Sequence, residues 1–317
     1  MFDFAPYLKV FKDNSYQEQF ARDGYVIIPF YNEEEINYLQ NLYQELHPKD
    51  EKGFFPSTFS KDREYRTRAD EEIQKIGSRT MNEVLCDTKV VCGSFIVKSP
   101  GPDSVMQLHQ DMTLVDESKF CGMNIWCPLI DLDDKNGVLK VLAGSQRIHP
   151  SYRGSSIPNI FDDQSEAIME YLKPVYLKAG EAIIFDQSIF HFSPPNMSDK
   201  VRIVTNIFFT HQDAGFRTAW FDKENHKGQV ELFEQPDDFM TKFDQFGHDI
   251  YARPKMGTSL GLVNYDFPQV TLEELEERYG KLPPKETMDI PETVNTEAQS
   301  VSSPNKGLIG WIKSLFS

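Results

Sequence analysis

The sequence predicts a mainly β fold, a jelly roll or barrel, with helices on its flanks. From about residue 90 onward, short runs rich in β-branched and aromatic residues follow one another. Turn signals such as Lys135-Asn136-Gly137 separate them, without regular intervening helices. The chain is 39% hydrophobic and 13% aromatic over 317 residues, which is enough to bury a core. The expected strands are VVCGSFIVK, MQLHQDMTLV, GMNIWCPLI, GVLKVL, EAIIF and RIVTNIFF.

The N-terminal third predicts helices instead. In NEEEINYLQNLYQELH, Asn32 is a candidate N-cap and Glu35 follows three positions later, which is the signature of a capping box. Apolar residues then recur at helical spacing, so one stripe of this helix is expected to be buried. A shorter helix is expected over SYQEQFARDG, ending at Gly24, and another over EEIQKIGSRTMNEVL.

The charge and the distribution of apolar residues indicate which partners and which cellular compartment to expect. A net charge of -16 and a pI near 4.9 repel the phosphate backbone, so nucleic acid is not an expected partner. The opening residues lack a basic and then apolar signal segment, and no apolar run approaches about 20 residues, so a cytoplasmic protein is expected. The four cysteines form no CxxC pair and are expected to be reduced packing residues.

Two ionisable residues stand two apart in the expected strand MQLHQDMTLV. Alternate residues of a strand face the same way, so His109, Asp111 and Thr113 are expected on one side of the sheet. An imidazole and a carboxylate at this spacing can form two corners of a metal site. Two histidines and one carboxylate with open positions are the ligand set of non-haem Fe(II) oxygenases.

A third ligand is needed to complete such a site. His191 is the best candidate, because it comes just after a strongly apolar strand, from where it could reach back across a barrel. His149 and His211 are the weaker alternatives, near SQRIHPSYRG and at a strand end.

Further residues could line a pocket beside the metal. Arg202 opens the strand RIVTNIFF, and its guanidinium fork could hold the distal carboxylate of 2-oxoglutarate while the other end chelates iron. Ser193 shares a strand face with His191 if this segment is extended, and its hydroxyl could then bind the same carboxylate. Trp126 suits a pocket wall or core packing, whereas Gln107 and Thr113 could contact a cosubstrate or only satisfy a neighbouring backbone group.

These residues lie in segments that resemble a known family. LHQD, NIWCPLIDLDDKNGVLKVLAGS and IIFDQSIFHFSPPNMSDKVRIV closely resemble the phytanoyl-CoA dioxygenase family of Fe(II)/2-oxoglutarate oxygenases, and GYVIIPFYNEEEINYLQ resembles its N-terminal opening. The resemblance implies a double-stranded β-helix with a cupin-like core and O2-dependent hydroxylation of a small or carrier-linked substrate. It also implies iron held by His109, Asp111 and His191, and 2-oxoglutarate held by Arg202 with Ser193 and Trp126 beside it.

The resemblance covers roughly residues 15 to 215 and has two departures. The chain reads LAGSQ where the family commonly has PGSH, which leaves the metal set intact but affects a loop near the pocket mouth. The region after residue 215 does not match the family, and substrate specificity is a candidate role for it.

We expect one oxygenase domain over residues 1–280. It would comprise a helical part to about residue 88, a jelly-roll core over about 89–212, and a lid or outer layer over about 213–280. Residues 281–305 have few large apolar groups and are expected to form a disordered linker. The segment KGLIGWIKSLFS, residues 306–317, is expected to be an amphipathic helix that docks on a partner protein or membrane surface, or packs back on its own domain.

Two other classes of function are compatible with these residues. A cupin-like metalloenzyme would use the metal without 2-oxoglutarate, and a binding or scaffold protein would keep the fold without catalysis. The ordered set of His109, Asp111, His191 and Arg202 favours the oxygenase.

Overall fold

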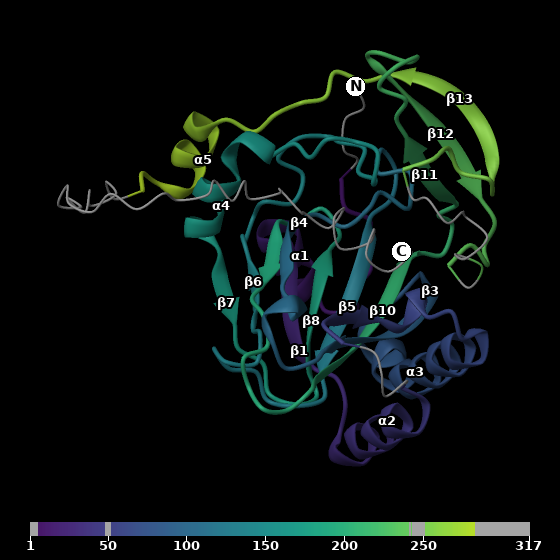
Figure 1. Ribbon diagram of the computed structural model, residues 1–317, viewed down its shortest axis with the longest axis vertical. Coiled ribbons are helices and arrows are strands. Elements are labelled where there is room, and N and C mark those ends of the chain that lie inside the picture. Colours follow the sequence, from purple (N-terminus) through teal and green to yellow (C-terminus); the bar gives the residue numbers. More distant parts are fainter. Residues whose placement is uncertain (1–5, 48–51, 241, 243–250, 283–317) are drawn as a thin grey trace, which may run out of the picture.

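Two antiparallel sheets form the centre of the computed structural model, which describes residues 6–47, 52–240, 242 and 251–282 (Figure 1). The larger sheet has the order β1-β8-β5-β10-β3-β2, and the smaller one has the order β4-β9-β6-β7. Residues of both sheets line one cavity between them. This arrangement of strands confirms the predicted mainly β fold with a jelly-roll core.

The strands of these two sheets are β1 (Tyr25–Pro29), β2 (Phe54–Pro56), β3 (Thr88–Lys98), β4 (Met106–His109), β5 (Gly122–Pro128), β6 (Leu139–Val141), β7 (Lys173–Val175), β8 (Glu181–Asp186), β9 (His191–Ser193) and β10 (Arg202–His211). All six predicted strand segments contain one of them. The sequence did not reveal β1, β2, β7 and β9, of which the last three have only three residues each and are too short to show a period of two.

Helices cover the outer face of the larger sheet, as Figure 1 shows for α2 and α3 beside β3 and β10. The helices are α1 (Asn14–Asp23), α2 (Glu33–Leu46), α3 (Arg63–Val84), α4 (Ser165–Tyr171) and α5 (Leu272–Tyr279). Successive side chains of β10 point alternately toward the helices and toward the cavity. Ile207 and Phe209 join the core under the helices, whereas Asn206 and Phe208 face the cavity.

The predicted capping box at the start of α2 is confirmed. The side chain of Asn32 accepts from the backbone N–H of Glu35 at 2.9 Å, and the Glu35 carboxylate accepts from the backbone N–H of Asn32 at 2.9 Å. Leu39, Leu42 and Tyr43 then form the buried stripe that the helical spacing predicted.

Replacing the cap should measurably destabilise the domain. We expect Asn32→Ala to lower the free energy of unfolding by about 1 kcal/mol, because the first turn of α2 loses a bonded acceptor. The measurement is urea-induced unfolding, with Asn82→Ala at an exposed position of α3 as the control for loss of an asparagine side chain. Equal unfolding midpoints for Asn32→Ala and the parent protein would contradict this role.

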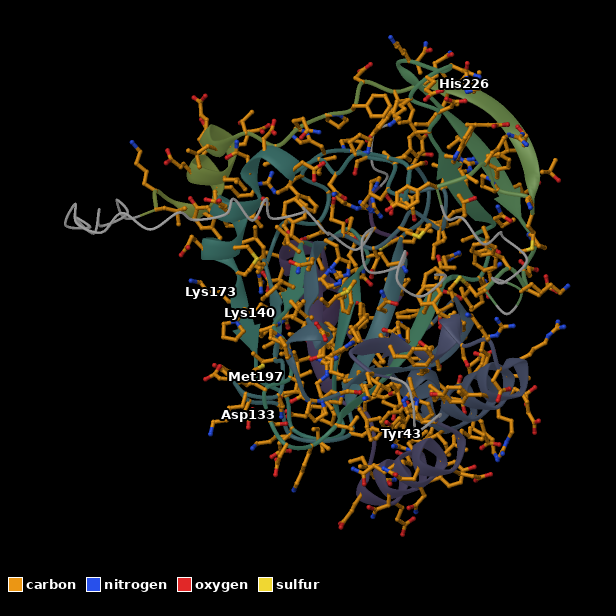
Figure 2. All side chains as sticks on the ribbon, in the orientation of Figure 1. Tyr43, Asp133, Lys140, Lys173, Met197 and His226 are labelled. Atoms are coloured by element: carbon orange, nitrogen blue, oxygen red, sulfur yellow. The ribbon has the colours of Figure 1, made fainter. Side chains whose placement is uncertain are left out.

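Residues after 211 contain a third sheet. It has the order β11-β12-β13, with strands β11 (Phe216–Trp220), β12 (Gln229–Gln235) and β13 (Thr258–Asn264). Phe216 and Phe239 pack in one buried cluster with Leu114 and Phe208 of the central fold. In Figure 2, His226 in the β11–β12 connection lies at the end of the molecule opposite Tyr43 of α2.

Two expectations about the C-terminal segments fall largely outside the described residues. The expected linker extends over 281–305, of which the structure describes only 281 and 282, and the expected helix at 306–317 is not among the described residues. Within the described part of the chain, no helix combines the length and apolar character that crossing a membrane requires.

Candidate active site

Three side chains converge at the junction of β4 and β9. His109 ends β4, His191 begins β9, and the two residues pair directly across the strands. Asp111 lies in the loop after β4, with its Oδ1 3.6 Å from His109 Nε2 and 3.8 Å from His191 Nε2. One ligand atom from each residue lies within 4.8 Å of the others, so this candidate metal site could hold one ion.

The outer nitrogens of both histidines are fixed by backbone carbonyls. His109 Nδ1 lies 2.7 Å from the carbonyl oxygen of Gln107, and His191 Nδ1 lies 3.0 Å from that of Ile189. A carbonyl only accepts, so each Nδ1 carries the proton and each Nε2 presents a lone pair toward Asp111. Burial lowers the pKa of His109 well below its usual range, with a further contribution from His191. Both imidazoles can therefore present Nε2 to a metal cation.

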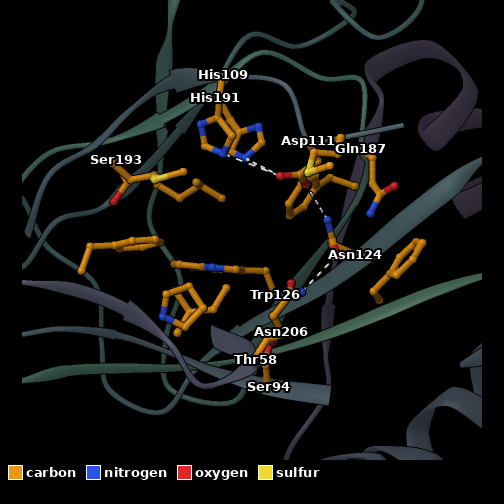
Figure 3. Close-up of a pocket in the computed structure, with 18 of the residues that line it drawn as sticks. Thr58, Ser94, His109, Asp111, Asn124, Trp126, Gln187, His191, Ser193 and Asn206 are labelled. Carbon is orange, nitrogen blue, oxygen red and sulfur yellow. Dashed lines mark hydrogen bonds and ion pairs between the residues drawn. The ribbon is translucent and has the colours of Figure 1, made fainter. Parts of the chain in front are cut away.

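The carboxylate of Asp111 is oriented by a row of two amides. Asn124 Nδ2 donates to Asp111 Oδ2 at 2.7 Å, and Asn206 Nδ2 donates to Asn124 Oδ1 at 3.0 Å. Figure 3 shows Asn124 and Asn206 continuing from Asp111 along the cavity wall. This leaves Asp111 Oδ1 directed at the two imidazoles. The bond between Asn124 and Asp111 links β5 to the loop after β4 and could not be identified from the sequence.

A buried ion pair holds the backbone of the same loop. Arg153 Nε donates to the carbonyl oxygen of Asp111 at 2.7 Å, and Arg153 Nη1 donates to Glu117 at 2.8 Å. The backbone N–H of Arg153 donates to Thr113 Oγ1 at 3.0 Å. The position of Asp111 is thus set by contacts to its backbone as well as to its side chain.

The orienting bond from Asn124 gives a testable effect on metal binding. Asn124→Leu should raise the Kd for Co(II) by about 10- to 100-fold, because outer partners of metal ligands typically contribute this much. Titration of Co(II) by absorption spectroscopy measures it. Asn264→Leu, at an exposed strand position in β13, is the matched control and should bind Co(II) like the parent protein. Equal affinity in the two variants would show that Asn124 does not orient Asp111.

The cavity extends from the candidate metal site to a buried arginine and has a volume of about 200 Å³. Arg202 is only 1% exposed and donates from Nη1 to the carbonyl oxygen of Gly137 at 2.7 Å and to Ser193 Oγ at 3.2 Å. The guanidinium carbon lies 5.2 Å from the ring centre of Trp126. Arg202, Ser193 and Trp126 are therefore together at this end of the cavity.

A second buried cation, Lys98, was missed by sequence reasoning. It pairs with Arg202 across β3 and β10, is 0% exposed, and donates to the carbonyl oxygens of Ser193 at 2.8 Å and Pro194 at 2.6 Å. Along β3, Lys98 is two positions from Ile96 and four positions from Ser94, which places the three residues on one face of the strand. The pairing with Arg202 depends on a register that the sequence does not reveal.

The two cations lack a carboxylate partner among the described residues. Burial, followed by the charge of Arg202, lowers the pKa of Lys98 well below its usual range. Burial also lowers the pKa of Arg202 to about 9. Like charges opposite each other destabilise a strand pair, and a buried charge without a counter-ion is costly. An anion bound in the cavity beside Arg202 would offset both effects.

The structure does not bring Gln107 and Thr113 to the cavity. The strand β4 ends at His109, and its pairing with β9 is irregular between Met106 and His109, so Met106 lines the cavity and Gln107 does not. The expectation that the alternation of β4 extends to Thr113 is wrong, because the strand ends at His109. The Thr113 hydroxyl accepts a hydrogen bond from the backbone N–H of Arg153.

The two weaker histidine candidates also lie elsewhere. His149 Nε2 is 3.2 Å from Glu274, at the contact with α5. His211 stacks on Phe120, and its Nδ1 lies 3.6 Å from Asp213.

Comparison with known proteins places this geometry in a family context. The phytanoyl-CoA dioxygenase (PhyH) family matches residues 20–204. The phytanoyl-CoA dioxygenase domain-containing protein 1 homolog of Dictyostelium discoideum is 26% identical over 134 residues, which are 38% of this chain and 46% of that protein. The match thus spans less than half of the relative's own length.

Two of the solved structures to which the chain is similar have 2-oxoglutarate (alpha ketoglutarate) in their descriptions. The non-heme alpha ketoglutarate dependent carbocyclase SnoK from nogalamycin biosynthesis has 17% identity and a TM-score of 0.48, covering 65% of this chain and 87% of that one. EvdO2 from Micromonospora carbonacea var. aurantiaca, complexed with 2-oxoglutarate, has 18% identity and a TM-score of 0.42, covering 67% and 94%. The family match itself spans more than half of the 317 residues, and the chain therefore belongs to the phytanoyl-CoA dioxygenase family.

Proposed function

We propose that the protein is a non-haem Fe(II)- and 2-oxoglutarate-dependent dioxygenase. It would hydroxylate an unactivated C–H bond of a small or carrier-linked organic substrate and release succinate and CO2. The observation that carries the proposal is the composition of one cavity, with two imidazoles and a carboxylate at one end and, at the other, the buried Arg202, which has no carboxylate partner among the described residues. Membership of the family supports the same conclusion.

His109, Asp111 and His191 would be the three protein ligands of the iron. Two imidazole nitrogens and one carboxylate oxygen are the donor set that non-haem Fe(II) oxygenases use, with positions left open for other ligands. When bound, Fe(II) with 2-oxoglutarate and O2 supplies the oxidising chemistry, and the protein supplies position and charge. The carbonyl bonds to both Nδ1 atoms and the Asn124 bond to Asp111 would keep the three donor atoms aimed at one point.

Arg202 would bind the distal carboxylate of 2-oxoglutarate. Its guanidinium donates to the carbonyl oxygen of Gly137 and to Ser193 Oγ, so the Ser193 hydroxyl would lie beside the same anion. Lys98 would add positive potential from the neighbouring strand while its ammonium group remains bonded to two carbonyl oxygens. A bound carboxylate would gain attraction to the guanidinium of Arg202 in a buried site.

Apolar side chains form part of the cavity wall. Trp126, Leu139 and Phe185 line the cavity and are buried. They would exclude water from the space between metal and substrate, which protects a reactive centre from side reactions.

The proposal is tested by succinate formation. The Fe(II)-loaded protein is supplied with 2-oxoglutarate, ascorbate and O2, alone and with acyl thioesters, amino acids and sugars. Succinate above the protein-free background, raised by at least one compound, is expected. No succinate in any condition, together with no binding of 2-oxoglutarate, would favour a metalloenzyme without this cosubstrate or a binding protein.

A further inference from the structure

We propose that the substrate is an uncharged, mainly apolar molecule with a hydrogen-bonding group, and that Asn206 is the side chain that binds this group. The inference rests on the proposed function, because it concerns the part of the same cavity that the metal and the cosubstrate would leave free.

Charged side chains of the described cavity lining occur in two places only. One is the candidate metal site, and the other is Arg202, at the end proposed for the cosubstrate. The remaining lining consists of apolar side chains, a cysteine, and neutral amides and hydroxyls such as Asn206, Gln187 and Ser94. An ionised substrate group there would lose its hydration without gaining a counter-ion, which is costly.

One group of apolar lining residues lies where the third sheet packs on the central fold. Phe208 lines the cavity and belongs to the buried cluster that also contains Phe216 of β11, and the partly buried Phe59, Met112 and Met240 line the cavity and pack against this cluster. The unbranched side chains of Met112 and Met240 can adapt to an apolar ligand of irregular shape. The region after residue 215 thus contributes directly to the wall that an apolar substrate would contact.

The row of amides fixes what Asn206 can offer to a ligand. Asp111 Oδ2 accepts from Asn124, so Asn124 Oδ1 is an acceptor and Asn206 must use its Nδ2 to donate to it. Asn206 Oδ1 then has no partner among the described residues, and Asn206 lines the cavity. A hydroxyl or an amide N–H of the substrate could donate to this oxygen, two residues along the row from the carboxylate of Asp111.

The net charge of the chain also bears on the charge of the substrate. A net charge of -16 repels polyanions, and a nucleotide-linked acyl thioester carries several phosphate charges. The acidic chain disfavours a polyanion, and the uncharged part of the cavity lining favours a neutral molecule over an ion of either sign.

Matched probes test the charge preference. The anaerobic protein, loaded with Fe(II) and 2-oxoglutarate, is titrated with decyl, phenylbutyl and naphthyl frames that each end in a carboxamide, a carboxylate or an ammonium group, and with decanoyl-CoA. Binding is read from the change in the metal-to-ligand charge-transfer band. We expect at least one carboxamide to bind about tenfold or more tightly than its charged partners and than decanoyl-CoA. The inference is wrong if a charged probe binds as tightly as its carboxamide, or if no carboxamide perturbs an existing band. Failure of the 2-oxoglutarate band itself would instead overturn the proposed function, and the inference with it.

Two variants of Asn206 test the assigned contact. Asn206→Leu should raise the Kd of the carboxamide probe by about tenfold and leave that of 2-oxoglutarate unchanged. Asn206→Asp should make the ammonium probe bind better than the carboxamide, a reversal that a purely structural role would not cause. The Co(II) affinity of each variant identifies any indirect effect through Asn124, and Asn264→Leu is again the control. Unchanged probe preference in both variants would refute the role of Asn206.

Discussion

Asp111→Ala is expected to abolish 2-oxoglutarate-coupled turnover. The substitution removes the only anionic donor of the candidate metal site and leaves two neutral imidazoles. It also leaves the amide of Asn124 without the carboxylate to which it donates at 2.7 Å. Fe(II) affinity should fall by more than the 10- to 100-fold loss typical of an outer partner. Succinate release and Fe(II) titration measure the two effects.

The chain contains its own matched control for this variant. The tripeptide His-Gln-Asp occurs twice, at residues 109–111 and at residues 211–213. Asp213 is 71% exposed and lies outside the cavity, beside His211. Asp213→Ala should therefore retain the parent rate of succinate release. Near-parent activity in Asp111→Ala, or equal losses in both variants, would contradict the assignment of Asp111 as a ligand.

Arg202→Met is expected to weaken 2-oxoglutarate binding while stabilising the ligand-free protein. Loss of a charge-assisted contact costs about 1.5 to 3 kcal/mol, or roughly 10- to 150-fold in Kd. The same change removes one of two buried cations that face each other without a carboxylate partner in the described residues. Replacing such a charge by an apolar side chain of similar volume often raises stability.

Two measurements on the same protein separate these effects. Calorimetric titration gives the Kd for 2-oxoglutarate, and thermal unfolding of the metal-free protein gives the change in Tm. Arg217→Met is the control, because Arg217 has a partner in Asp116 at 3.1 Å. An unchanged Kd for 2-oxoglutarate in Arg202→Met would show that Arg202 does not bind the cosubstrate. A lower Tm would show that the charge of Arg202 is compensated in the ligand-free protein.

The fold and the candidate metal residues could be predicted because their signals are local. The capping box at Asn32 and Glu35 and the apolar strands around Ile125 and Ile207 each depend on a few neighbouring residues. The two copies of His-Gln-Asp show where local patterns fail. In the structure, His109 pairs with His191 and Asp111 accepts from Asn124, whereas Asp213 is 71% exposed, and these long-range differences do not show in the tripeptide itself.

The rest of the site depends on distances across the sheets. Lys98 and Arg202 are 104 positions apart, and their proximity follows from the register of β3 and β10. Asn124 and Asn206 likewise meet because β5 and β10 are neighbours. The irregular pairing of β4 changed which of its residues face the cavity, which is why the expectation for Gln107 was not met.

The most direct test of the central claim is anaerobic titration of 2-oxoglutarate into the Fe(II)-loaded protein, followed by visible absorption. The proposed site predicts a metal-to-ligand charge-transfer band that saturates at one equivalent in the parent protein and in Asp213→Ala, and that is absent in Asp111→Ala. A parent protein that binds Fe(II) but develops no such band at saturating 2-oxoglutarate would contradict the account.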